Sequence, residues 1–225
     1  MNAQGKRSGE TAREYAYRMI REQVISLELK PGEAFNDMEF AAKIGVSRTP
    51  VREAVIQLSE ESRIIEIFPQ RGMRIAPINV ELVEEARSLR VLLEKQIAGM
   101  CCEMATEEDI KWLQENVGLQ EFYIENSRPE MVMQLDDEMH HKLFMICHRE
   151  LTYGMCQKLA IHYDRIRSLS VNTVKDNTII EDHRKIIQFI AEHKKENAMA
   201  QMEKHLSRWQ LNEGKFRQEF PDYFK

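Results

Sequence analysis

The sequence predicts a mainly α-helical fold: an N-terminal winged helix-turn-helix with a small β-hairpin wing, followed by an all-α bundle of six to seven helices. Three observations predict this fold. Two short amphipathic segments flank Gly45, a glycine-tipped hairpin pattern follows them, and the residues from 80 onward have a helical pattern almost throughout. The chain of 225 residues is long enough for two domains with separate cores.

The two patterns meet at the short segment Pro77-Ile78-Asn79, which we interpret as a linker. The residues before position 10 are polar and contain two glycines, which is typical of a disordered tail. We therefore expect a disordered tail, a winged helix-turn-helix domain, a linker, an all-helical domain and a C-terminal tail: residues 1–9, 10–76, 77–79, 80–215 and 216–225.

The first domain begins with apolar side chains at helical spacing over residues 10–28, which predicts a helix with one buried face. Asn36 is placed to cap a second helix, and Glu39 follows at the spacing of a capping box. Gly45 suits the left-handed residue at the end of that helix. Ser47 is then placed to cap a third helix.

The third helix carries Arg48, Thr49 and Arg52 on its outward, N-terminal side, while Val51 and Leu58 point inward. Arginines at the start of the second helix of a helix-turn-helix make contacts in the DNA major groove. These residues therefore predict a DNA-binding protein.

A β-hairpin wing is predicted to follow over residues 63–75, with Gln70, Arg71 and Gly72 at its tip. The net charge of the chain is −5, so the distribution of charge matters for a DNA-binding protein. Residues 1–75 hold 12 Lys and Arg against 11 Asp and Glu, and the rest of the chain holds 20 against 26. The acidic excess therefore lies outside the part predicted to bind DNA, which leaves that part free to present a basic face.

The composition also predicts where the protein works. No apolar run approaches the roughly 20 residues that a membrane-spanning helix needs, and the N-terminus lacks the apolar core of a secretory signal. The four cysteines form no CxxC pattern, which is typical of reduced thiols. We therefore expect a cytoplasmic protein without a membrane partner.

The second domain is predicted to be a bundle of helices joined by short loops. Thr106 precedes three acidic residues that complement a helix N-terminus, and Pro129 separates two helices. The expected helices lie near residues 79–104, 106–126, 130–148, 151–171, 178–193 and 196–214.

Potential metal ligands lie at three places in this bundle. Asp136 and His140 are four residues apart on one helix, which places them on the same face. His183 lies early in the next-to-last helix, and His205 lies on the last. One carboxylate and three imidazoles suit a divalent transition metal such as zinc, nickel or manganese. The Asp136–His140 spacing alone also fits a solvated surface pair, and Asp137 lies within one turn of His140 as well.

The N-terminal part resembles the winged-helix domain of the GntR family of bacterial transcription regulators. The resemblance rests on Val-Ser-Arg-Thr-Pro-Val-Arg-Glu-Ala at 46–54, with Leu-Lys-Pro-Gly upstream at 29–32 and Pro-Gln-Arg-Gly downstream at 69–72. It implies that the start of the third helix and the tip of the wing contact DNA, through Ser47, Arg48, Thr49, Arg52, Arg71 and Gly72. Met38 stands where many relatives carry a DNA-contacting Arg, so Arg48 and Arg52 become the main candidates for base reading.

The helical part resembles the FCD effector domain of the FadR-like subfamily. Many such domains hold a metal through an Asp-x-x-Phe-His run and one His on each of two later helices. Here the corresponding residues are Asp136, His140, His183 and His205, with Met139 in place of Phe. The Arg-x-x-Leu-Glu pattern of the subfamily appears at residues 90–94 and implies an effector-binding role for Arg90. An ordinary ion pair between Arg90 and Glu94 fits the same spacing.

Together these parts predict a sequence-specific transcriptional regulator, a repressor that leaves DNA when a small carboxylate binds at a metal site in the helical domain. A homodimer would place two recognition helices on a short palindromic operator. One alternative is a DNA-binding regulator with a purely structural metal and no effector. Another is a metal-dependent enzyme, although no base or nucleophile motif accompanies the ligands. We therefore do not expect an enzyme.

Overall fold

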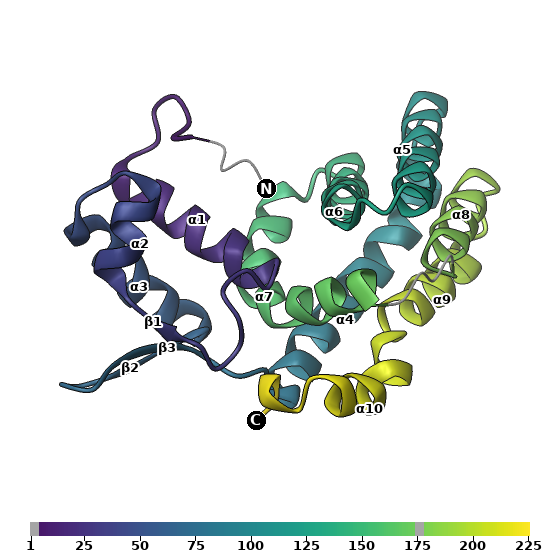
Figure 1. Cartoon of the computed structure of the whole chain (residues 1–225). Helices are drawn as coiled ribbons and strands as arrows, with labels where there is room; N and C mark the ends of the chain where they lie inside the picture. The colour runs from purple at the N-terminus through teal and green to yellow at the C-terminus, as the bar shows by residue number, and fades with distance from the viewer. Residues whose placement is uncertain (1–4, 174–177) are drawn as a thin grey trace. The chain divides into compact units, whose positions relative to one another are not determined.

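The computed structural model describes residues 5–173 and 178–225, and these residues form two units. The first unit comprises Met1–Val80 together with Arg217–Lys225, and the second comprises Glu81–Phe216. The expected tail at residues 1–9 lies partly outside the described residues. Figure 1 shows helices and a small sheet in the first unit and a set of helices in the second, which confirms the predicted fold class.

The first unit is built on three helices: α1 (Ala12–Ile25), α2 (Asp37–Ile44) and α3 (Arg48–Ser62). Helix α1 packs against α3, and α2 packs against both. Their shared core is apolar, because each helix turns one buried face inward. The fully or nearly fully buried residues of this core are Ala16, Ile20, Val24, Phe40, Ala41, Val51, Ala54, Val55 and Leu58.

A three-stranded antiparallel sheet completes the first unit. Strands β2 (Ile65–Phe68) and β3 (Gly72–Ile75) form the predicted wing hairpin, in which Ile65 is paired with Ile75. Strand β1 (Ala34–Phe35) pairs with β3 on its other side and was not predicted, because two residues are too few for a periodic signal. The sheet closes over the end of α3 through Ile64, Ile65 and Ile75, which are buried.

The turn of the helix-turn-helix has the predicted backbone but not all of the predicted caps. Gly45 ends α2 at φ 73°, in the left-handed region. Asn36 accepts hydrogen bonds from the backbone N–H groups of Met38 and Glu39, as predicted. However, Glu39 accepts from the Asn36 side chain, so the predicted capping box is incomplete. Ser47 lies at the N-cap of α3, but its side chain makes no capping hydrogen bond there, which corrects the prediction for this residue.

The C-terminal residues, expected to form a tail, are folded within the first unit. Helix α10 (Trp209–Glu219) is followed by a short 3-10 turn, Pro221–Tyr223. Phe224 then forms a parallel bridge with Ile78. The Ile78 N–H donates to the Tyr223 carbonyl at 2.7 Å, and the Lys225 N–H donates to the Ile78 carbonyl at 3.0 Å. The segment expected to be a simple linker is therefore held by main-chain hydrogen bonds.

The second unit is all-helical over its described residues. Its helices are α4 (Val80–Met104), α5 (Glu107–Glu125), α6 (Pro129–Ile146), α7 (Glu150–Thr173), α8 (Thr178–Ala191) and α9 (Lys195–Leu206), followed by most of α10. The expected last helix at 196–214 is wrong as a single element, because the chain turns at Ser207-Arg208 between α9 and α10. None of the described helices combines the length and apolarity needed to cross a membrane.

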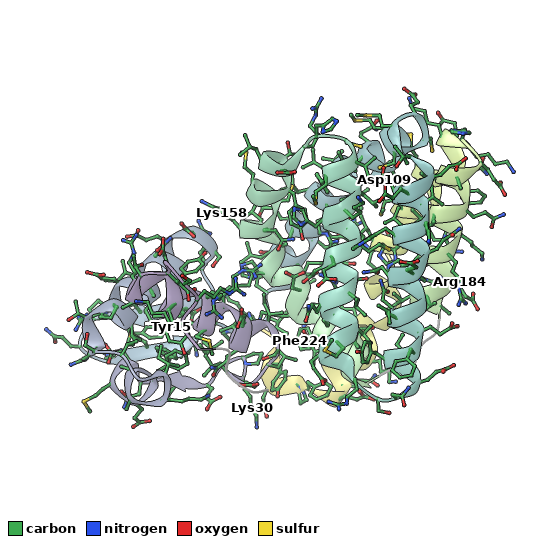
Figure 2. The ribbon with its side chains drawn as sticks, turned by 90° about the horizontal axis from the view of Figure 1, so that it is seen from above. Tyr15, Lys30, Asp109, Lys158, Arg184 and Phe224 are labelled. Carbon is green, nitrogen blue, oxygen red and sulfur yellow. The ribbon has the colours of Figure 1, made fainter. Side chains whose placement is uncertain are left out.

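The core of the second unit lies between these helices. Helix α5 packs against α6 and α8, α6 against α7, and α8 against α9. Apolar side chains fill the space between them, whereas Arg184 lies at the outer edge of α8 and pairs with Glu121 of α5 (Figure 2). Buried members of this core include Ile97, Cys101, Leu113, Val117, Met139, Phe144, Ile186, Ala198 and Met202.

The backbone of Gly45 gives a direct stability prediction. We expect Gly45→Ala to lower the free energy of unfolding by about 1–2 kcal/mol, because an L-residue is strained at this positive φ. The added Cβ would meet no described atom within 4 Å, so the cost is one of backbone conformation alone. The control is Gly118→Ala in α5, which also has open space and should raise stability by about 0.4–1 kcal/mol. Denaturant titration of both variants measures the two effects, and effects of equal sign would contradict the assignment.

Candidate functional site

The predicted DNA-contacting residues of α3 lie together on one exposed surface. Ser47, Arg48, Thr49 and Arg52 are all exposed, and they occupy the N-cap and first turns of the helix. The hydroxyl of Ser47 is not used in capping, so the first N–H groups of α3 have no side-chain cap from this residue. Such a helix end attracts anions such as a DNA phosphate, because its N–H groups and its dipole point outward.

A buried carboxylate of α2 holds the Arg48 side chain in place. Its Nε donates to Oδ1 of Asp37 at 3.0 Å. Asp37 is the first residue of α2 and is buried, whereas the Arg48 side chain is 57% exposed. The guanidinium group is therefore anchored to the helix-turn-helix itself and presented outward from it.

The wing carries the other predicted DNA-contacting residues. Arg71 lies in the turn between β2 and β3, Gly72 is the first residue of β3, and both are exposed. Gln70 and Gly72 adopt φ values of 61° and 100°, so the tight turn needs the left-handed region at two positions. Arg74 on β3 pairs with Glu66 across the hairpin at 2.5 Å. Arg71 is thus presented at the tip of the wing, on a different element from the arginines of α3.

The four predicted metal ligands meet inside the second unit. Asp136 and His140 come from α6, His183 from α8 and His205 from α9, and one potential ligand atom of each lies within 4.8 Å of the others. His183 Nε2 lies 3.2 Å from Asp136 Oδ1 and 3.3 Å from His205 Nε2. All four residues are buried. The structure places Asp136 in this group. Asp137 lies outside the group and pairs with Arg167, which pairs with Asp136 as well.

Neighbouring side chains orient two of the histidines. Oε1 of Gln120 lies 2.9 Å from His183 Nδ1, and Gln120 itself donates to Asn116 at 2.7 Å. Because a carbonyl oxygen accepts, His183 Nδ1 carries the proton and Nε2 presents a lone pair to the group. His140 Nδ1 lies 2.5 Å from Glu94 Oε2, which directs His140 Nε2 to the group in the same way. Carboxylate and carbonyl partners of this kind accompany metal-binding histidines.

The charges of the group favour a bound cation. Burial raises the pKa of Asp136, but Arg167 and His183 outweigh burial and hold this pKa well below its ordinary value, so the carboxylate stays ionised. Burial lowers the pKa of His183, and burial together with His183 and His140 lowers the pKa of His205 well below its ordinary value. The group therefore offers one ionised carboxylate together with the uncharged imidazoles of His183 and His205 at neutral pH. His140 Nε2 is buried and has no hydrogen-bond partner among the described residues.

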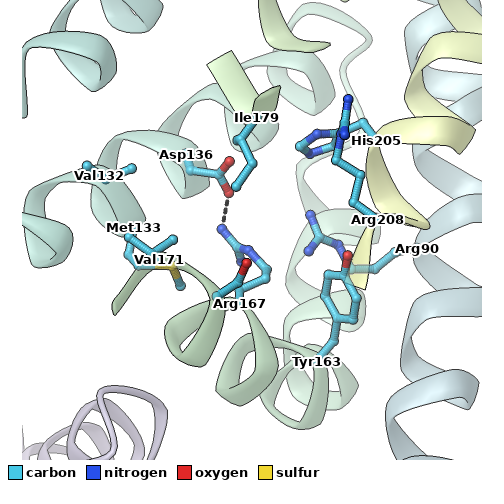
Figure 3. Close-up of a pocket in the computed structure, with 11 residues that line it drawn as sticks. Arg90, Val132, Met133, Asp136, Tyr163, Arg167, Val171, Ile179, His205 and Arg208 are labelled. Carbon is cyan, nitrogen blue, oxygen red and sulfur yellow. Dashed lines mark hydrogen bonds and ion pairs between the residues drawn. The ribbon is translucent and has the colours of Figure 1, made fainter. Parts of the chain in front are cut away.

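A pocket opens beside this group (Figure 3). Asp136 and Arg167 lie on one side of it, joined by an ion pair, and Arg90, Tyr163, His205 and Arg208 lie on the other. Its cavity volume is about 50 Å³, several times the roughly 10–15 Å³ that one water needs, so it suits only a small ligand. The rest of the lining consists of Ser170 and four apolar residues: Val132, Met133, Val171 and Ile179.

Arg90 forms the expected ion pair and also lines the pocket. Its Nε donates to Glu94 at 2.5 Å, so the expected ion pair is present and buried. Its guanidinium also lines the pocket and lies 5.2 Å from the ring centre of Tyr163. Nη1 of Arg90 is buried and has no hydrogen-bond partner among the described residues. This nitrogen is a charged donor available to a ligand in the pocket.

Several site residues had no signal in the sequence. Gln120 on α5 and Arg167 on α7 belong to no motif, and their roles follow only from the packing of helices far apart in the chain. Arg208 lies in the turn after α9 and pairs with buried Asp182, which lies 4.0 Å from His205 Nδ1. The spacing of Arg90 and Glu94 indicated that Glu94 could pair with Arg90, but not that Glu94 also lies beside His140. The remaining histidines lie outside the four-residue group: His141, His148, His162 and His193.

Two family models match this chain. The model described as bacterial regulatory proteins, gntR family, matches residues 12–75. The FCD domain model matches residues 85–208, which is more than half of the chain. The first match includes the exposed arginines of α3 and the wing, and the second includes all four residues of the buried group.

Curated relatives span nearly the same length. The HTH-type transcriptional repressor RspR of Escherichia coli K12 is 28% identical over 209 residues, 92% of this chain and 91% of that protein. The Nta operon transcriptional regulator of Aminobacter aminovorans is 26% identical over 185 residues, 82% of this chain and 86% of that protein. Among solved structures, E. coli McbR/YncC has a TM-score of 0.75 at 18% identity and covers 93% of this chain and 99% of its own. That structural likeness supports the fold.

Proposed function

Because the chain belongs to the GntR family of bacterial regulatory proteins and carries an FCD domain, it is a DNA-binding transcriptional regulator, and we propose that a small carboxylate controls its operator binding. The carboxylate would bind beside a divalent transition metal in the helical domain. The matched families and relatives are regulators and not enzymes, so the enzyme alternative is rejected. The regulator would act in the cytoplasm, where bacterial DNA lies.

The metal part of the proposal rests on the donor set. Asp136, His140, His183 and His205 bring one carboxylate and three imidazoles within 4.8 Å of one another in a buried place. Without a cation, the lone pair of His183 Nε2 would face another ring nitrogen at 3.3 Å. Zinc, nickel and manganese accept such nitrogen and oxygen donors. When bound, the metal would supply a Lewis-acidic position for an anionic ligand.

The observation that carries the carboxylate proposal is Nη1 of Arg90, a buried charged donor without a hydrogen-bond partner among the described residues. It lines the same pocket as Asp136 and His205, two members of the metal group. A carboxylate in this pocket could accept from Nη1 while its other oxygen faces the metal position. Arg167 and Arg208 add positive charge to the lining, although acidic partners already compensate them.

Control of DNA binding requires two DNA-binding units whose relative placement the effector changes. We propose a homodimer on a short palindromic operator, because two recognition helices then read two equivalent half-sites. The output would be repression, with release when the carboxylate binds. The alternative is a purely structural metal without an effector. A structural site needs neither a ligand pocket nor an unused charged donor in it, so the pocket and Nη1 of Arg90 favour an effector.

Thermal unfolding of the metal-loaded protein with a panel of small mono- and dicarboxylates tests this proposal. At a concentration 100 times its Kd, the true effector should stabilise the fold by about 2.7 kcal/mol, or roughly 5–10 °C in Tm. Removal of the metal by a chelator should abolish the shift. A metal-dependent fold that no carboxylate stabilises would instead support the structural alternative.

Arg90→Lys should keep the charge that compensates Glu94 but lose the planar fork that binds a carboxylate. We expect normal metal content and a much smaller Tm shift with the effector. The matched control is Arg184→Lys, which changes an exposed arginine paired with Glu121 and should leave the shift unchanged. An equal shift in Arg90→Lys and the parent protein would remove Arg90 from the site.

A further inference from the structure

The contact between Asp37 and Arg48 joins the two helices of the helix-turn-helix. Asp37 is 3% exposed and lies at the first position of α2, directly after the cap residue Asn36. Its Oδ1 accepts from Arg48 Nε at 3.0 Å, while the Arg48 side chain is 57% exposed. A buried carboxylate thus holds the inner edge of an exposed guanidinium.

The atoms used in this contact determine which atoms of Arg48 remain for DNA. Arginine has a planar fork of nitrogen donors, and Nε is the innermost of them. With Nε bound to Asp37, the terminal pair Nη1 and Nη2 is left to face away from the protein. Two parallel donors match O6 and N7 of guanine in the major groove, which is the commonest specific base contact.

The same contact limits the motion of Arg48 before DNA arrives. An unrestrained arginine loses much rotamer freedom when it binds, which weakens the contact that it makes. Asp37 belongs to a capped helix turn, because Asn36 binds the N–H groups of Met38 and Glu39. Its carboxylate is therefore a fixed point. The second oxygen of Asp37, Oδ2, is buried and has no hydrogen-bond partner among the described residues. The contact of Oδ1 with Arg48 is therefore the polar contact that accounts for a buried carboxylate at this position.

We propose that Asp37 is a positioning residue for base reading: it holds Arg48 so that the terminal nitrogens of the guanidinium select guanine at one position of each operator half-site. This inference rests on the proposed DNA contact of Arg48. The alternative is a purely structural role, in which Asp37 stabilises the N-terminus of α2 through the helix dipole. The two roles separate by experiment, because only the first acts on a single base pair.

The test is selection of preferred sequences from randomised DNA by the full-length protein, followed by competition binding against operators changed at one base pair. Arg48→Ala should lower discrimination at one G·C pair by roughly 5- to 150-fold. Asp37→Ala should lower discrimination at that same pair by roughly two- to fivefold, the range of a partly exposed ion pair. Asp37→Asn keeps an oxygen that can accept from Nε, so it should retain most of the selectivity.

Two controls separate positioning from general effects. Glu53→Gln removes one negative charge from an exposed position on α3, so it reports the gain in non-specific affinity that any lost carboxylate causes. In an Arg48→Ala background, Asp37→Ala should change selectivity no further, because the two residues act through one contact. Circular dichroism and thermal unfolding check that Asp37→Ala is folded. If it is not, Asp37→Ser replaces it, because serine also removes the carboxylate but is favoured at a helix start.

The outcomes are distinct. Positioning by Asp37 is supported if Asp37→Ala loses selectivity at the Arg48 base pair alone, Glu53→Gln does not, and the double variant loses no more than Arg48→Ala. A uniform loss of affinity for all sequences in Asp37→Ala would overturn it and leave only helix stabilisation. Unchanged selectivity in Arg48→Ala itself would overturn both the inference and its premise, and this result is distinguishable because it does not involve Asp37.

Discussion

Replacement of His183 with alanine is expected to reduce metal affinity by more than about 100-fold, since loss of even an outer partner of a metal ligand costs about 10–100-fold. His183 is fully buried, and its Nε2 lies within 3.3 Å of both Asp136 and His205. Its loss leaves two imidazoles and a carboxylate, which is a weaker donor set for a transition metal. The carboxylate effect on Tm should disappear with the metal.

Elemental analysis after dialysis, together with competition against a metal-binding dye, measures this prediction. His141→Ala is the matched control, because this neighbour of His140 stacks on Tyr153 and lies outside the group. Gln120→Leu should give an intermediate loss of about 10–100-fold, since it removes only the partner of His183 Nδ1. Equal metal content in His183→Ala and the parent protein would refute the site. DNA binding should persist in the variant, which shows that the first unit remains folded.

Replacement of Arg52 with alanine is expected to cost about 1–3 kcal/mol of operator binding and to relax selectivity at one base pair. Arg52 lies one helical turn after Arg48 on the exposed side of α3, so both side chains face the same way. Because it is exposed, its loss should not change the stability of the fold. The whole effect should therefore come from the lost contact with DNA.

Titrations of the operator and its single-base variants at several salt concentrations distinguish the kind of contact. If Arg52 reads a base, its loss should change selectivity at one operator position. If it binds a phosphate, its loss should weaken binding to all sequences equally and reduce the slope of log affinity against log salt concentration by about one. Arg184→Ala on the second unit is the control for lost positive charge. Unchanged affinity and selectivity in Arg52→Ala would exclude this residue from the interface.

Local rules were sufficient for much of the first unit. Gly45 was predicted to adopt the left-handed region because the two helices must turn there, and its φ is 73°. The hydroxyl of Ser47 was predicted to cap α3 and does not. Sequence places a residue at the N-cap but does not fix its side-chain rotamer. The two-residue strand β1 and the pairing of Phe224 with Ile78 depend on distant parts of the chain, so no local pattern could indicate them.

In the second unit, spacing predicted which ligands share a helix but not what surrounds them. Asp136 and His140 lie on one face because they are four residues apart. Gln120, by contrast, contacts His183 across 63 positions of sequence, and only helix packing brings them together. The break at Ser207-Arg208 was also missed, because apolar periodicity continues on both sides of it. This break places Arg208 beside the pocket.

The central claim is that a carboxylate at the metal site controls operator binding. The most direct measurement is a gel shift of the metal-loaded protein with the DNA upstream of its own gene, at physiological salt and with excess non-specific DNA. We predict a discrete complex that survives the competitor. The carboxylate that raises the Tm should dissociate this complex for the parent protein. The complex formed by Arg90→Lys should persist in the presence of the same carboxylate. A specific complex that is unchanged by every carboxylate that raises the Tm would contradict the claim.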